Sequence, residues 1–167
     1  RIPVPVEINA SAHADDDFSK NKSIAELTDW NIYSPVWAPV SLEDQWLKLQ
    51  DKDPFDYAKV ERKIPASKEL KVSFDLKAGQ NNKGTLQIEF LDENGIACSR
   101  MELTDDGIFR LKGGSRFANM MKYEAGKIYH VEAVLSTVDR NIQVYVDGKR
   151  VGLRMFYAPV AAVHSRL

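Results

Sequence analysis

Paired carboxylates are the first residues in this sequence that could carry chemistry, because glycosidic bonds are hydrolysed between two such groups. The nearest arrangement holds Glu89, Asp92 and Glu93, with Asn94-Gly95 directly behind it. A retaining mechanism needs the two carboxyl groups about 5–5.5 Å apart. Glu89 and Glu93 share a strand parity, but a turn interrupts the strand between them. We therefore interpret these acids as solvated charges at a hairpin turn and predict no catalytic residues.

Aspartate clusters could supply the oxygen ligands that calcium requires. Asp51, Asp53 and Asp56 lie close together in the sequence, and residues 15–17 are three further aspartates. The alternative interpretation is that Asp51 and Asp53 are turn residues ahead of Pro54. No glycine-punctuated loop of the EF-hand kind supports the metal. A structural calcium is therefore a hypothesis, and no other cofactor is predicted.

Aromatic rings and planar polar groups are the residue types that hold sugars in a concave site. The residues that we predict to contact a carbohydrate are Trp46, Tyr57, Arg116, Tyr145, Arg154 and Tyr157. The alternative is that the tryptophans belong to the core. Tyr145 is the best-placed aromatic, because alternation along its strand directs its ring outward.

Other catalytic patterns are absent from the sequence. His13, His130 and His164 lack the spacing of metal ligands, so we interpret them as isolated surface or strand histidines. No Gly-x-Ser-x-Gly elbow supports a nucleophilic serine. Residues 113–116, Gly-Gly-Ser-Arg, are not a phosphate loop, since no Lys-Ser or Lys-Thr follows at the required spacing.

The composition bounds the class of protein. The chain has 167 residues, of which 44% are hydrophobic and 28% charged, and its net charge is −1. That charge disfavours nucleic acid and anionic membranes as partners. No apolar run approaches the roughly 18 residues that span a bilayer. The single cysteine, Cys98, excludes an internal disulfide and a site built from several thiolates.

The ends of the chain indicate a piece of a longer protein. Residues 1–14 contain Pro3 and Pro5 among apolar residues, so we expect a linker or edge segment from a preceding domain. Residues 15–167 are the predicted domain. The first residue is Arg1, and residues 161–167 read as the start of another strand. We therefore expect missing flanking sequence and a domain truncated at its C-terminus.

Alternating strands must position the candidate residues. The cleanest is 70–76, with Leu70, Val72, Phe74 and Leu76 on one face. Residues 127–151 are predicted to form a β-hairpin that reverses at Asp147-Gly148 in a type I′ turn, with Ile142, Val144 and Val146 facing the core.

About ten strands recur at the spacing typical of antiparallel sandwiches, and residues 23–27 form one helical turn at most. We expect Pro65 to end the strand that begins at Tyr57, and a loop to run from Gly113 to Met121. The predicted fold class is all-β, an antiparallel two-sheet jelly-roll sandwich.

Two stretches carry a resemblance to a known family. They are Tyr123-Glu124-Ala125-Gly126-Lys127-Ile128-Tyr129-His130-Val131 and Val144-Tyr145-Val146-Asp147-Gly148-Lys149. In this order they resemble the last third of concanavalin A-like lectin/glucanase domains, including laminin-G-like modules. The resemblance implies a jelly roll, in which a structural calcium is often held on the convex side. The Glu-x-Asp-x-(x)-Glu run of its laminarinase-like members is not found here.

A narrower similarity rests on the start of the chain and two later stretches. These are residues 1–6, the acidic loop, residues 30–35 and residues 49–58. They look like the sandwich that follows a sialidase-type β-propeller in some bacterial polysaccharide-degrading enzymes. This resemblance implies that residues 1–8 leave the propeller and that the protein is secreted or periplasmic.

We therefore predict a non-catalytic accessory or carbohydrate-binding module of a larger polysaccharide-active enzyme, a glycoside hydrolase or polysaccharide lyase. Its partners would be a polysaccharide or oligosaccharide and an adjacent catalytic domain. One alternative is a purely structural domain that packs on a catalytic propeller. The other is a glycoside hydrolase or lyase in its own right.

Overall fold

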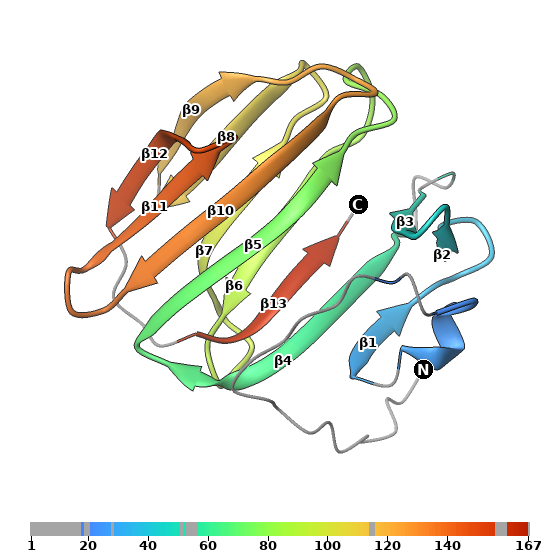
Figure 1. Cartoon of the computed structure of the whole chain (residues 1–167), viewed down its shortest axis with the longest axis horizontal. Helices are drawn as coiled ribbons and strands as arrows, with labels where there is room; N and C mark the ends of the chain where they lie inside the picture. Colours follow the sequence, from blue (N-terminus) through green and yellow to red (C-terminus); the bar gives the residue numbers. More distant parts are fainter. Residues whose placement is uncertain are drawn as a thin grey trace.

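The computed structural model describes residues 18, 21–27, 29–50, 52, 57–113, 116–155 and 160–166. These residues form two main layers of antiparallel strands, preceded by one short 3-10 helix, η1 (Ile24–Glu26). Figure 1 shows the smaller sheet lying across the larger one. The predicted all-β, two-sheet sandwich is confirmed.

The larger sheet has seven strands in the order β1-β4-β13-β6-β7-β8-β9. Their bounds are β1 (Trp30–Tyr33), β4 (Lys59–Ser67), β13 (Val160–Arg166), β6 (Leu86–Leu91), β7 (Ala97–Leu103), β8 (Ile108–Gly113) and β9 (Arg116–Lys122). The final strand of the described chain, β13, is thus inserted between β4 and β6. A pairing of this kind joins residues that are far apart in sequence.

The smaller sheet has four strands in the order β12-β11-β10-β5. Their bounds are β12 (Lys149–Met155), β11 (Asn141–Val146), β10 (Ile128–Ser136) and β5 (Glu69–Lys77). A separate two-stranded sheet pairs β2 (Val40–Glu43) with β3 (Trp46–Leu49). It lies near one end of β1 and β4 (Figure 1).

The predicted 127–151 hairpin is two consecutive hairpins. The first joins β10 to β11 through residues 137–140, and the second joins β11 to β12 at Asp147-Gly148. Asp147 has φ 50° and Gly148 has φ 83°, which are the two positive values that a type I′ turn requires. Ile142, Val144 and Val146 are buried, as predicted.

Two predicted boundaries are wrong. Strand β4 continues through Pro65 to Ser67, because its pairing with β13 shifts register between Val160 and Ala162, and a bulge tolerates a residue without an N–H. The loop expected from Gly113 to Met121 is largely strand β9. Its pairing with β8 is also irregular, which masks the alternation in the sequence.

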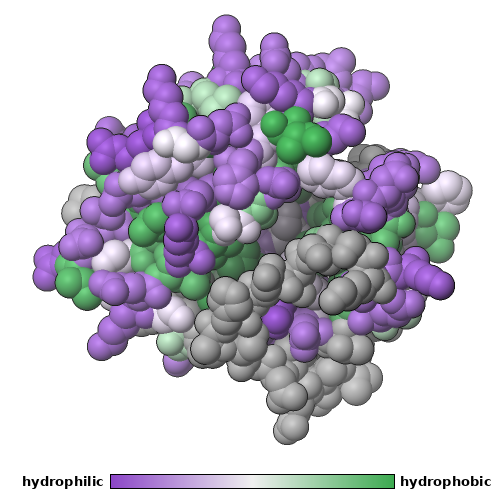
Figure 2. Space-filling view, in the orientation of Figure 1, coloured by the Kyte–Doolittle hydropathy of each residue, from purple (hydrophilic) through white to green (hydrophobic). Residues whose placement is uncertain are grey.

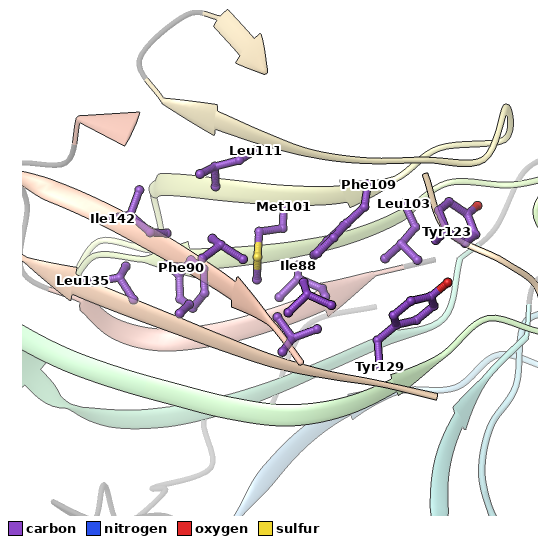
Figure 3. Close-up of a cluster of buried hydrophobic side chains, with 14 residues drawn as sticks. Ile88, Phe90, Met101, Leu103, Phe109, Leu111, Tyr123, Tyr129, Leu135 and Ile142 are labelled. Carbon is purple, nitrogen blue, oxygen red and sulfur yellow. The ribbon is translucent and has the colours of Figure 1, made fainter. Parts of the chain in front are cut away.

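The main core fills the space between the two sheets (Figure 3). Strands β6, β7 and β8 contribute apolar side chains from one layer, and β10 and β11 contribute them from the other. The largest fully buried side chains are Phe90, Met101, Leu111, Leu135, Ile142, Val131 and Val144. Ile88 and Phe90 face this core. Because side chains alternate between the two faces of a strand, Gln87 and Glu89 must face the opposite side of the sheet.

A smaller cluster packs beside the main core. Ala38, Val40, Ala58 and Val60 are buried there, and Trp30 lies against them. It joins the two-stranded sheet to the β1 and β4 edge of the larger sheet. This contact fixes the end of the sandwich at which the loop after β1 emerges.

Candidate functional site

Two continuous rows of mostly polar side chains cross the outer face of the seven-stranded sheet, on the side away from the main core. Cross-strand pairing places the first row, from β1 to β9, as Asn31, Glu61, His164, Glu89, Arg100, Lys112 and Phe117. The second row is Tyr33, Lys59, Arg166, Gln87, Glu102, Arg110 and Asn119. We call these two rows the polar face. Directly opposed side chains on neighbouring strands are close enough to interact.

Glu89 lies at the centre of the polar face and is only 8% exposed. One of its oxygens, Oε2, accepts hydrogen bonds from Arg100 Nε at 3.0 Å and Arg100 Nη2 at 2.8 Å. The other oxygen, Oε1, lies 3.7 Å from Nδ1 of His164. Two charge-assisted hydrogen bonds from one guanidinium to one carboxylate oxygen fix the orientation of both side chains.

A second buried carboxylate repeats this arrangement one row away. Glu102 is 4% exposed, and its Oε2 accepts hydrogen bonds from Arg110 Nε at 3.0 Å and Nη2 at 2.6 Å. Its Oε1 lies 3.6 Å from Arg100 Nη1 and accepts a 3.4 Å hydrogen bond from Gln87. Arg100 therefore links the two carboxylates into one charged network.

His164 is the least satisfied member of the polar face. It is 7% exposed, and its Nε2 has no hydrogen-bond partner among the described residues. Burial lowers the pKa of His164 below its ordinary value, with a further contribution from the charge of Lys59. The imidazole is thus neutral near neutral pH, and its Nε2 is closed off from solvent.

Aromatic rings lie at both margins of the polar face. The guanidinium of Arg110 lies 4.1 Å from the centre of the Phe117 ring on the β9 side. On the β1 side, the guanidinium of Arg166 lies 4.8 Å from the centre of the Tyr57 ring, which in turn lies 5.2 Å from that of Tyr33. The arrangement offers fixed hydrogen-bonding groups between two aromatic borders, which is the chemistry of sugar recognition.

The structure places the predicted sugar-binding residues on several surfaces. Tyr57 is at the margin of the polar face. Tyr145 lies on the outer face of the other sheet, where its hydroxyl donates to Gln143 Oε1 at 3.0 Å. Trp46 belongs to β3 of the two-stranded sheet and is half-buried. These three aromatics do not share one face.

The two predicted arginines also lie apart. Arg116 is exposed at the start of β9. Arg154 is paired with Ile142, so it is directed toward the space between the sheets, and its buried Nε has no partner among the described residues. Tyr157 and the calcium candidates Asp51, Asp53 and Asp56 lie outside the described residues. Within the described ranges, no three His, Cys, Asp or Glu side chains are grouped to hold a metal ion.

Two interpretations from the sequence need correction. Glu89 is a buried residue inside β6, since the turn begins only at Asp92, whose side chain accepts hydrogen bonds from the N–H groups of Asn94 and Ile96. His164 is buried beside Glu89 rather than isolated. The alternation of Leu86, Ile88 and Phe90 was the signal that placed Glu89 on the opposite face. No local signal could bring His164 to it.

In the described part of the chain, no helix is long and apolar enough to span a bilayer.

The outer face of the smaller sheet is mostly hydrophilic in Figure 2, with isolated apolar side chains. Tyr145 and the exposed His130–Asp75 pair, with 2.8 Å between Nδ1 and Oδ1, belong to this face.

Comparison with solved structures gives three informative likenesses. A chain described as a sialidase is 84% identical, with a TM-score of 0.92, over 99% of this chain and 16% of its own length. The chain therefore spans 16% of the length of that sialidase. The Crh5 transglycosylase is 12% identical, with a TM-score of 0.71 over 96% of this chain and 72% of its own. A tetrameric galectin from the sponge Cinachyrella is 10% identical, with a TM-score of 0.50 over 64% of this chain and 85% of its own.

The last two likenesses concern the fold alone, and they bear out the concanavalin A-like sandwich that the sequence resembles. A comparison with curated protein sequences gives no match. A family model described as "Sialidase-like, CBM domain" matches residues 30–166. The chain therefore belongs to this family of sialidase-like carbohydrate-binding modules.

Proposed function

We propose that this chain is a non-catalytic carbohydrate-binding module that holds a sialidase-like enzyme on its glycan. The observation that carries the proposal is the arginine–carboxylate network of Arg100, Arg110, Glu89 and Glu102 on the polar face, in a chain of the carbohydrate-binding family.

Among the surfaces formed by the described residues, the polar face supports this function best. Sugar hydroxyls are both donors and acceptors, and the face presents arginine donors beside carboxylate acceptors in fixed positions. Because Glu89 and Glu102 already bind arginines, these groups are oriented before a ligand arrives, which lowers the entropic cost of binding. In this proposal Arg100, Arg110 and Arg166 contact the glycan above the buried residues.

The organisation of the parent protein is part of the same proposal. Residues 1–14 are a linker or edge segment from a neighbouring domain, and residues 15–167 are the module. The adjacent catalytic domain is the protein partner, and the parent enzyme is secreted or periplasmic. The likeness to a much longer sialidase chain supports this organisation.

A glycan array followed by calorimetry tests the function. The array identifies a bound oligosaccharide, and titration calorimetry then compares the wild-type chain with Arg166→Ala and Arg150→Ala. Arg166 lies on the polar face beside Tyr57, whereas Arg150 is exposed on the smaller sheet opposite Tyr145. Loss of one charge-assisted hydrogen bond should weaken binding by about tenfold or more in Arg166→Ala.

The matched control, Arg150→Ala, should bind within about twofold of wild type, because it lies on the other face of the sandwich. The alternative, a purely structural domain, predicts that no glycan on the array is retained by the folded wild-type chain. That result would overturn the proposed function.

A further inference from the structure

Two positively charged side chains face each other across strands β4 and β13 on the polar face. Lys59 and Arg166 are directly opposed in the pairing of these strands, which places their Cβ atoms about 5 Å apart. Like charges at directly opposed positions destabilise a sheet. The same row continues to Tyr33 on one side of the pair and to Gln87 on the other, and both are uncharged. These four adjacent positions therefore hold two positive charges and no negative charge.

No carboxylate of the described chain neutralises either charge. The side chains of Lys59 and Arg166 form no ion pair and no hydrogen bond with a described residue. The nearest acids on the polar face have other partners, since Glu89 is held by an arginine of β7 and Glu61 accepts a 3.2 Å hydrogen bond from Asn31 Nδ2. An anion supplied from outside the chain would offset the repulsion between the two positive charges.

The pair can be reached from solvent, and aromatic rings lie beside it. Arg166 is exposed and Lys59 is half-buried. The guanidinium of Arg166 rests on the Tyr57 ring, which is in contact with the ring of Tyr33. Tyr57 is 39% exposed and Tyr33 is 37% exposed. Because the aromatic ring covers one face of the planar guanidinium, the N–H groups at its edge remain free to donate to a ligand.

We propose that Lys59 and Arg166 form a subsite for the anionic group of an acidic sugar, a carboxylate or a sulfate ester. The inference rests on the proposed carbohydrate-binding function and adds to it a class of ligand. Arg166 donates charge-assisted hydrogen bonds to the oxygens of the anion, and Lys59 supplies a second positive charge. The sugar ring that carries the anion lies against the exposed surface of Tyr57 and Tyr33.

The glycan array and calorimetry with chemically modified ligands test the class of ligand. The array should retain oligosaccharides that carry a carboxylate or a sulfate. Calorimetry then compares the selected oligosaccharide with its neutral derivative, made by reducing the carboxyl group to an alcohol or by removing the sulfate. The neutral derivative should bind about tenfold or more weakly, because charge-assisted hydrogen bonds are lost. The treatment that weakens binding identifies the anionic group.

Lys59→Glu tests the subsite itself, because it places opposite charges at the two opposed positions. Binding of the acidic oligosaccharide should weaken by about tenfold or more, whereas affinity for the neutral derivative should stay within about twofold of wild type. The urea midpoint should be no lower than that of wild type, since the repulsion with Arg166 is removed. Lys59→Met, which removes the charge alone, should weaken binding of the acidic oligosaccharide in the same direction.

Lys77→Glu is the matched control. It makes the same change in net charge at an exposed position of β5, opposite Ile128 in the smaller sheet. The acidic oligosaccharide should bind this variant within about twofold of wild type.

The outcomes separate this inference from the proposed function. Selection of neutral oligosaccharides alone by the array, or equal affinities for the acidic and the neutral form, would overturn the subsite and leave the function standing. Equal losses in Lys59→Glu and Lys77→Glu would also overturn it, because the net charge of the chain would then be responsible. No glycan retained by the folded wild-type chain would overturn both.

Discussion

His164 and Glu89 lie directly opposite each other on the adjacent strands β13 and β6, with 3.7 Å between Nδ1 and Oε1. Both are buried, with charged or polar side chains on the neighbouring strands and the buried apolar pair Leu91 and Ala162 next to them along their own strands. This pair joins the last strand of the described chain to the centre of the seven-stranded sheet. It also places a neutral imidazole against a carboxylate that Arg100 already holds.

Replacing His164 should change how stability depends on pH. Burial lowers the pKa of His164 in the folded chain below its value of 6.5 in model peptides, so the unfolded chain binds the proton more tightly. The free energy of unfolding should fall as pH drops through 6.5 toward the lowered folded pKa. In His164→Gln this fall should be smaller.

Urea unfolding of wild type and His164→Gln, measured at intervals from about pH 8 to pH 5, checks this prediction. The difference in stability between the two chains should shift in favour of the variant as the pH decreases. A difference that stays constant across the range would contradict the neutral state assigned to the buried imidazole.

Glu102→Gln should destabilise the fold. The carboxylate is buried and accepts two hydrogen bonds from Arg110, while Arg100 lies beside its other oxygen. Because both arginines are partly exposed and can reach water, we expect a cost of about 1–3 kcal/mol, below that of breaking a fully buried pair. Glu93→Gln, at an exposed turn, is the control and should change stability by less than about 0.5 kcal/mol. Equal losses of stability in Glu102→Gln and Glu93→Gln, measured by chemical denaturation, would contradict a contribution of this network to stability.

Gly152→Ala should also be destabilising, for a steric reason. A Cβ atom at position 152 would lie 2.4 Å from Met120 Sδ and 3.3 Å from Leu111 Cδ2. Leu111 is fully buried, so the overpacking should cost about 1–3 kcal/mol. Gly79→Ala, where no atom lies within 4 Å of the added Cβ, should be neutral or slightly stabilising.

A double variant separates crowding from other effects of that substitution. In the Met120→Ala background, the contact at Sδ is removed and Gly152→Ala should cost less than it does alone. A cost that is the same in both backgrounds, measured by thermal unfolding, would mean that Met120 is not the obstacle.

Cys98 should react slowly with thiol reagents. Burial raises the pKa of its thiol to about 11, and Sγ donates to Phe90 O at 3.1 Å. Since the thiolate is the nucleophile, its reaction with a disulfide reagent near pH 8 should be on the order of a hundredfold slower than that of a free thiol. The rate should rise to the free value in denaturant. A fast reaction in the folded chain would contradict the raised pKa.

The sequence predicted best where one face of a strand is buried. The alternation of Leu70, Val72, Phe74 and Leu76 in β5 and of Ile142, Val144 and Val146 in β11 follows directly from the period of two along a strand. The Asp147-Gly148 turn followed from the two positive φ values that it requires. In each case the residue types within one short segment were sufficient for the prediction.

The candidate site was harder to predict because it depends on pairing between distant segments. Alternation shows that Tyr145 and Glu89 both face outward, but it does not show that they lie on opposite faces of the sandwich. The insertion of β13 between β4 and β6 brings His164 to Glu89, and nothing near either residue in sequence signals this contact.

The most direct test of the account is to map the glycan on the protein by NMR. Backbone amide shifts of the isotopically labelled chain would be recorded during titration with the oligosaccharide that the array selects. The largest shifts should fall in β6, β7, β8 and β13, around Glu89, Arg100 and His164. Shifts confined to β5, β10 and β11, around Tyr145, would contradict the assignment of binding to the polar face.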